Sequence, residues 1–294
     1  MIPMVLMMIV ISIYSIVDGF FISNYAGSDA FAGMNMIWPA IALVGALGLM
    51  VGTGGSALVS KTFGEGEPEK ANQIFSMLVK LTVFVGAVAA VLLFIIMPWL
   101  AKTLGADENM LGHAVLYGRI LVIVLPAYML QMAFQPFFMV AEKPQLGTML
   151  SIACGVTNIV LDALFVACLG WGLTGAAIAS SISLCIGGGF PLWYFSSRRN
   201  TTQLRFVKAE LQWGSIAKSC TNGLSEFVGN IALNVLAICY NWQLMQYIGA
   251  DGVSAYGVIM YLGFIFAAVF IINASRKPRN LQFLGGIDAA FCCY

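Results

Sequence analysis

Three acidic residues fall inside apolar stretches of the chain, and they are its strongest candidates for chemistry. Asp18 lies in IVDGFF, Asp162 in NIVLDALFV and Glu226 in GLSEF. A carboxylate near the middle of a membrane span costs on the order of 2.5–3.5 kcal/mol, so such groups usually face a water-filled cavity and bind ions or protons. The structural alternative for each is a carboxylate close to a helix end that faces lipid headgroups.

Asn158 precedes Asp162 by four residues, which places both side chains on one face of a helix. Their oxygen atoms could coordinate a sodium ion, because hard cations prefer oxygen ligands. Alternatively, the amide could hydrogen-bond the carboxyl group while that group takes up and releases a proton. A third reading is a polar pair that only ties two helices together. The spacing does not separate these three roles.

The composition predicts that the helices carrying these residues lie in a membrane. Hydrophobic residues make up 60% of the chain and charged residues only 9%, and the mean hydropathy is +0.90. A soluble domain carries about 25% charged residues, and a span needs about 20 mostly apolar ones. We therefore expect an all-α membrane protein with about eight spans. The predicted spans are 1–25, 31–59, 72–100, 114–140, 147–169, 173–195, 215–248 and 252–273.

The basic residues predict the orientation of the spans. The loops after the second and sixth spans hold Lys61 and Lys70, and the group Arg198, Arg199, Arg205 and Lys208. Basic loops stay in the cytoplasm, so both termini are expected there. The opposite side offers only Lys102 and Arg119. The expected location is the cell membrane, as a multi-pass protein of the bacterial inner membrane. A net charge of +1 argues against nucleic acid as a partner.

Two similar segments indicate an internal repeat. YAGSDAFAG (25–33) and YIGADGVSA (247–255) align at Tyr25, Gly27 and Asp29 with Tyr247, Gly249 and Asp251, 222 residues later. Each segment joins one predicted span to the next. Paired repeats are typical of secondary transporters, whose substrates bind at the repeat interface.

The repeat predicts four regions. Residues 1–195 form a six-helix lobe, 196–214 a basic cytoplasmic linker, 215–273 part of a second lobe and 274–294 an atypical polar tail. A second copy of equal length would need four further spans. We therefore expect a truncated or frame-altered product; the alternative is a naturally short transporter.

No motif predicts an enzyme or a resident cofactor. GTGG in the second span lacks the lysine and hydroxyl residue that complete a phosphate-binding loop. His113 is the only histidine, so no Ser/His/Asp set is possible inside the spans. Five of the seven cysteines lie in apolar segments without metal-ligand spacing.

Several strings together resemble the MATE family of multidrug and toxic compound extrusion transporters. They are IVDGFFISNYAG, GTGGSALVSKTFGEGEPEKANQIF, NIVLDALFV, WGLTGAAIASSIS and GLSEF, in this order and spacing across much of residues 1–272.

The resemblance implies twelve helices in two six-helix lobes, and export of cationic amphipathic drugs in exchange for protons or sodium. It implies that Asp18, Asn158, Asp162 and Ser180 form the cation-binding site, with a possible Na⁺ at Asn158 and Asp162. Glu226 becomes a possible substrate or proton site, and Pro3 a helix-bending residue. Part of the amino terminus and most of the last four family helices have no counterpart in this sequence.

The expected partners are small cationic or amphipathic substrates and the lipid bilayer, with the protein as a monomer. No cofactor is expected other than the coupling ion, which is a proton or a sodium ion. Two alternatives remain: a flippase for lipid-linked precursors, and an inactive truncated membrane protein. The flippase would need cations to hold phosphate, and Arg119 is the only candidate inside a span.

Overall fold

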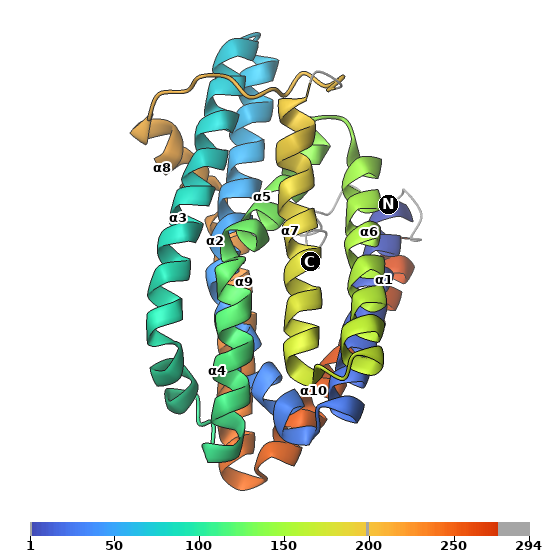
Figure 1. The fold of residues 1–294 in the computed structure, drawn as a ribbon. Helices are drawn as coiled ribbons and strands as arrows, with labels where there is room; N and C mark the ends of the chain where they lie inside the picture. The colour runs from blue at the N-terminus through green and yellow to red at the C-terminus, as the bar shows by residue number, and fades with distance from the viewer. Residues whose placement is uncertain (1, 198–199, 276–294) are drawn as a thin grey trace.

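This computed structural model describes residues 2–197 and 200–275, and the regular secondary structure in that part is entirely helical (Figure 1). No strand occurs in that part, which confirms the predicted fold class. The helices are α1 (Ile2–Tyr25), α2 (Ser28–Gly64), α3 (Pro68–Thr103), α4 (Glu108–Ile123), α5 (Leu125–Val140), α6 (Pro144–Asp162), the π-helical turn η1 (Ala163–Cys168), α7 (Gly172–Ser196), α8 (Trp213–Asn222), α9 (Leu224–Tyr247) and α10 (Ala250–Ser275).

The lengths of the helices agree with a membrane bundle. Within the described residues, α2, α3, α6 with η1, and α7 are each long and apolar enough to cross a bilayer. The bent pairs α4/α5 and α8/α9 raise this number to six. The first and last predicted spans fall on α1 and α10, which are 24 and 26 residues long. Many side chains of these two helices lie outside the described residues, so the full count of eight remains a prediction.

Each of the predicted spans 114–140 and 215–248 falls on two helices with a bend between them. The chain bends by 60° between α4 and α5 and by 54° between α8 and α9. Pro126 stands in the first turn of α5 and disfavours a helical backbone at the residue before it. At the second break, Gly223 lies against the backbone of Met50 in α2, where a Cβ atom would be 2.9 Å from the carbonyl carbon.

Local signals fix where several helices begin. Asp107 caps α4, because its Oδ1 accepts the N–H groups of Asn109 and Met110 at 3.1 and 3.0 Å. Pro68 and Pro144 open α3 and α6, where the missing N–H group has no helical partner in any case. The loops around these starts are therefore short and well defined.

The apolar side chains are divided between an interior core and an exposed belt. Helix α2 runs through the middle and packs against α3, α4, α5, α8 and α9. Phe75 of α3 is fully buried against the rings of Phe134, Phe137 and Phe195. On the outside of α3, Phe84 is 67% exposed, as expected of a helix whose outer face contacts lipid.

The two repeated segments have the same local structure and touch each other. Gly27 and Gly249 have φ angles of +95° and +84°, and each joins the end of one helix to the start of the next. Ser28 Oγ donates to Asp251 Oδ1 at 3.1 Å across the two segments. Helices α9 and α10 thereby pack against α1 and α2, behind α4 and α7 in Figure 1.

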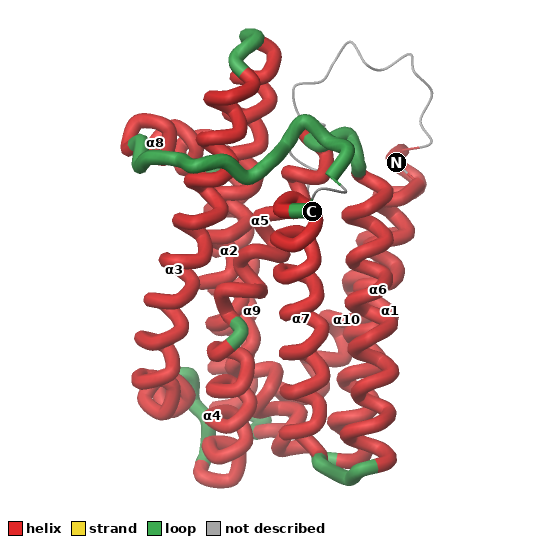
Figure 2. The backbone as a smooth tube through the Cα atoms, turned by 45° about the horizontal axis from the view of Figure 1, so that its top comes forward, coloured by secondary structure: helices red, strands yellow, loops and turns green. Residues whose placement is uncertain are grey.

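The linker after α7 crosses one end of the bundle before α8 begins, as Figure 2 shows. Side chains of α3 hold its extended backbone. Asn72 Oδ1 accepts the N–H of Arg205 at 2.8 Å, and Ser76 Oγ accepts the N–H of Val207 at 2.9 Å. The predicted polar linker is thus a strap that is fixed to the first lobe.

Candidate functional site: a buried acidic cluster

Helices α1 and α6 bring Asp18, Asn158 and Asp162 together, and these three residues are called the acidic cluster below. The two helices pack along each other, and the carboxyl groups of Asp18 and Asp162 are close enough to interact electrostatically. Asn158 Nδ2 donates to Asp162 Oδ2, as their spacing of four residues predicts. The exposed fractions are 9% for Asp18, 3% for Asn158 and 0% for Asp162.

The acidic cluster has oxygen atoms left over for a ligand. Asp18 Oδ1 and Asp162 Oδ1 are buried and have no hydrogen-bond partner among the described residues. Buried polar atoms are nearly always paired, so each unpaired one calls for an explanation. Two adjacent buried carboxylates also repel each other unless a proton or a metal cation neutralises them. Both observations point to a bound cation or a shared proton.

A change in helix geometry begins directly after Asp162. The π-helical turn η1 covers Ala163–Cys168, and the Leu169 N–H bonds to the Leu164 carbonyl at 2.9 Å. π-Helical turns are rare and occur frequently at functional sites, because the extra residue per turn redirects the side chains. Asp162 therefore lies at a junction between two kinds of helix, within the candidate membrane span Pro144–Cys168.

The donor atoms of the acidic cluster suit a small, hard cation. The three side chains offer carboxylate and amide oxygens, the ligands that alkali and alkaline-earth ions prefer. The residues that the structure describes contain no group of three or more His, Cys, Asp or Glu that could hold a metal ion. The oxygen atoms of Asp18, Asn158 and Asp162 could therefore hold a hard cation.

The other predicted site residues lie elsewhere on the helices. Ser180 is half-buried in α7, and Glu226 is half-buried in the first turn of α9. No hydrogen bond among the described residues joins either of them to the acidic cluster. Pro3 is the second residue of α1, and its side chain lies outside the described residues. Their predicted roles remain predictions.

Ser183 makes a contact near the acidic cluster, and the sequence analysis did not single out this residue. Its Oγ donates to the Cys154 carbonyl at 2.9 Å, which joins α7 to α6 one turn before Asn158. The run GLTGAAIASSIS of small and polar residues predicted close helix packing, and it was the available signal for this contact. The choice between Ser180, Ser181 and Ser183 depends on how α7 is rotated, which the sequence does not determine.

Comparisons with known proteins show which family the chain resembles. The family model described as MatE matches residues 3–164, which include the whole acidic cluster. The multidrug export protein MepA of Staphylococcus haemolyticus is 23% identical over 256 residues, and that of Staphylococcus saprophyticus is 22% identical over 259 residues. These matches cover 87% of this chain but only 56% and 57% of the relatives. The chain therefore spans little more than half of their length.

Solved transporter structures share the fold. The MATE multidrug transporter DinF-BH, solved in complex with a dye, aligns with a TM-score of 0.84 at 24% identity, over 90% of this chain and 59% of that one. An inward-facing multidrug resistance MATE family transporter aligns with a TM-score of 0.79 at 19% identity, over 87% of this chain and 60% of that one. The MatE family model covers more than half of the 294 residues of this chain, and the chain therefore belongs to the MATE family of membrane transporters.

Proposed function

We propose that the protein is a secondary active transporter that exports cationic, amphipathic compounds in exchange for protons or sodium ions. The observation that carries this proposal is the buried acidic cluster, with two carboxylate oxygens that lack a partner among the described residues. The relatives named multidrug export proteins, and the similar transporter solved with a bound dye, support the substrate class.

The acidic cluster would couple the two fluxes through its charge. With the cluster ionised, its negative charge favours a bound cationic substrate; with a proton or sodium ion bound, that attraction is lost. Binding of the ion therefore favours release of the substrate, and by linkage the substrate favours release of the ion. Alternating access between the two sides of the membrane would then convert an ion gradient into export.

The test is efflux of a cationic dye from cells that express the gene. We expect Asp162→Asn to abolish ion-driven efflux, because an amide neither takes up a proton nor supplies the negative charge. Asp29→Asn is the matched control, since Asp29 is exposed in the first turn of α2. The proposal fails if Asp162→Asn exports dye with the same dependence on the ion gradient as the wild type.

The coupling ion can be assigned with membrane vesicles in which a proton gradient or a sodium gradient is imposed separately. Dye movement driven by one gradient alone identifies that ion. Movement that is indifferent to both gradients would contradict antiport.

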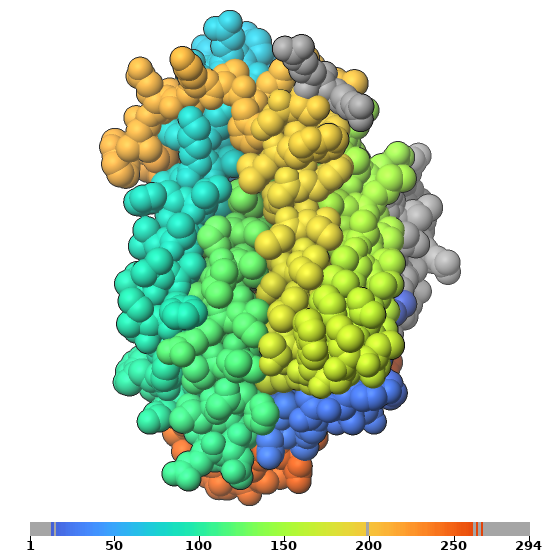
Figure 3. Space-filling model, viewed as in Figure 1, coloured from blue at the N-terminus to red at the C-terminus, as the bar shows by residue number. Residues whose placement is uncertain are grey.

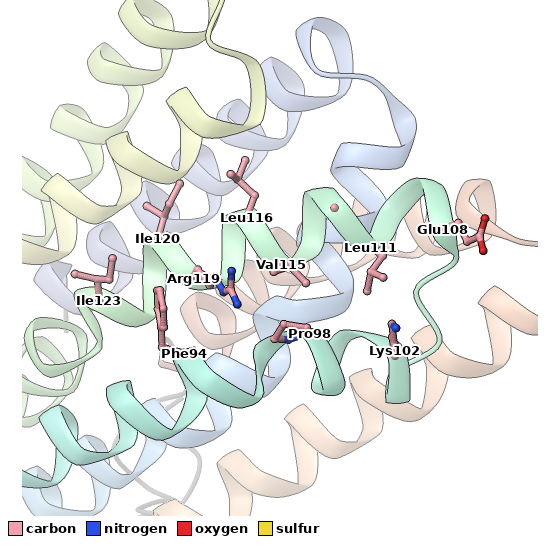
Figure 4. Close-up of a pocket in the computed structure, with 11 residues that line it drawn as sticks. Phe94, Pro98, Lys102, Glu108, Leu111, Val115, Leu116, Arg119, Ile120 and Ile123 are labelled. Atoms are coloured by element: carbon pink, nitrogen blue, oxygen red, sulfur yellow. The ribbon is translucent and has the colours of Figure 1, made fainter.

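A flippase for lipid-linked precursors is the weaker candidate. It needs cations inside the transport cavity, and the cation considered for that role, Arg119 of α4, faces α3 (Figure 4). Its guanidinium carbon is 5.0 Å from the ring centre of Phe94 in α3, whereas the acidic cluster is built from α1 and α6.

A further inference from the structure

A groove of about 610 Å³ runs between α3 and α4. Figure 4 shows Phe94, Pro98 and Lys102 on its α3 side, and Leu116, Arg119 and Ile123 on its α4 side. Apart from Lys102, Arg119 and Glu108, its lining side chains are apolar. The transport proposal makes no use of this groove.

The groove lies on a face that the described helices of the second lobe do not cover. Helices α9 and α10 pack against α1 and α2, while α3 and α4 lie side by side on the surface in Figure 3. Apolar side chains on this face, such as Ile95 and Ile123, are 67% and 65% exposed. In a bilayer, such a surface is in contact with lipid chains.

The basic residues of α3 place the Lys102 end of the groove at one edge of the hydrocarbon layer. Lys80 and Lys102 are both exposed and 22 residues apart, which corresponds to about 33 Å along a helix. This length matches the roughly 30 Å of a bilayer's hydrocarbon core. Trp99, 65% exposed, lies within one turn of Lys102, as expected of an aromatic side chain at the interface.

Arg119 carries a donor that nothing in the described protein uses. Its Nε is buried and has no hydrogen-bond partner among the described residues. The acidic residue of the groove, Glu108, stands 11 residues earlier on α4, or about 16 Å along the axis. The ion pairs recorded for the described residues, Lys61–Glu65 and Lys70–Glu67, involve neither Arg119 nor Lys102. The groove therefore holds two cations and one carboxylate, and Figure 4 shows this carboxylate at the Lys102 end, away from Arg119.

We propose that this groove binds an anionic phospholipid. Lys102 attracts the phosphate of the headgroup at the edge of the groove, and Arg119 extends toward it from beside Phe94, about 12 Å away along α3. One acyl chain lies along Phe94, Ile120 and Ile123. A guanidinium suits this role because its N–H donors match phosphate oxygens, and because its long side chain can reach from an apolar site to the interface. A zwitterionic lipid fits less well, because it has no net charge to complement the net positive charge of Lys102, Arg119 and Glu108 together. This proposal is independent of the transport function.

Native mass spectrometry of the full chain in a mild detergent tests the proposal. The probe is an equal mixture of phosphatidylglycerol and phosphatidylcholine with matched acyl chains. We expect the wild type to retain one phosphatidylglycerol in clear preference to phosphatidylcholine. Arg119→Gln should lower that preference about tenfold, the size expected when one charge-assisted hydrogen bond is lost. Lys102→Gln should lower it as well, and Lys102 is an exposed residue whose replacement leaves the core intact.

Lys80→Gln is the matched control, because it removes the same charge from an exposed position on the same helix, outside the groove. It should retain the wild-type preference. Equal losses in Lys80→Gln and Lys102→Gln would overturn the proposal in favour of general surface attraction. A wild type that does not discriminate between the two lipids would overturn it outright. Helical circular dichroism of each variant separates loss of binding from loss of the fold.

Discussion

Among single residues, Asn158 determines how the Asp162 carboxyl group is presented. The amide donates to one carboxylate oxygen, while the other oxygen has no partner among the described residues. The four-residue spacing made this contact predictable from the sequence, since residues four apart on a helix are neighbours. The approach of Asp18 depends on how α1 packs against α6, and the sequence carries no direct signal for that packing.

Asn158→Leu should destabilise the protein by about 1–3 kcal/mol, because it leaves a second buried carboxylate oxygen unpaired. It should also reduce the rise in melting temperature that the coupling ion gives the wild type. Thermal unfolding in detergent, with and without sodium and at two pH values, measures both effects.

Asn234→Leu is the control for Asn158→Leu. Asn234 also bonds within its own helix four residues back, to Asn230, but it lies on α9 and outside the acidic cluster. If both variants keep the ion-dependent rise in melting temperature, Asn158 has only a structural role.

For the helices, the sequence predicted the positions of the elements better than their shapes. The apolar runs placed α2, α3 and α7 within a few residues of their ends. The bends were missed although Pro126 and the Asn222–Gly223 pair mark them, because prolines are common in membrane helices and seldom decisive alone. The π-helical turn after Asp162 has no such marker in the sequence.

Close packing of α2 against the α8/α9 break depends on glycine. A Cβ atom on Gly54 would overlap the Ser219 carbonyl oxygen and lie 2.6 Å from the Gly223 nitrogen. Backbone atoms cannot move aside as a flexible side chain can. Gly54→Ala should therefore cost about 1–3 kcal/mol and lower the melting temperature.

Gly64→Ala is the matched change in the same helix, because a Cβ there meets nothing within 4 Å. It should melt like the wild type. Equal melting temperatures for Gly54→Ala and the wild type would show that α2 and the α8/α9 break can move apart to make room for a methyl group at little cost.

Across the whole molecule, the two similar segments, 25–33 and 247–255, have the same local structure. Three aligned identities predicted an internal repeat from the sequence, and both segments have a left-handed glycine between helices. The contact between the two segments could not be predicted from the sequence, because it depends on how α9 and α10 pack against α1 and α2. Ser28 lies 3.5 Å from Ser254, Oγ to Oγ, across this contact.

A disulfide between these positions should restrain the two lobes. In a background without the seven native cysteines, Ser28→Cys with Ser254→Cys should cross-link on oxidation and stop dye export, and a reductant should restore export. Peptide mass spectrometry detects the bond, and Ser28→Cys alone is the control. Full export by the cross-linked protein would mean that this contact persists throughout the transport cycle.

The central claim is that the acidic cluster couples ion binding to substrate binding. The dependence of substrate affinity on the ion tests this claim most directly. The measurement is the affinity of the purified protein for a cationic fluorescent dye as sodium concentration and pH are varied, in the wild type and in Asp162→Asn. The wild type should bind the dye at least about fivefold more weakly once the coupling ion is present, the lower end of typical coupling between sites. Asp162→Asn should bind it with one affinity throughout. An unchanged ion dependence in Asp162→Asn would contradict the assignment of the acidic cluster as the coupling site.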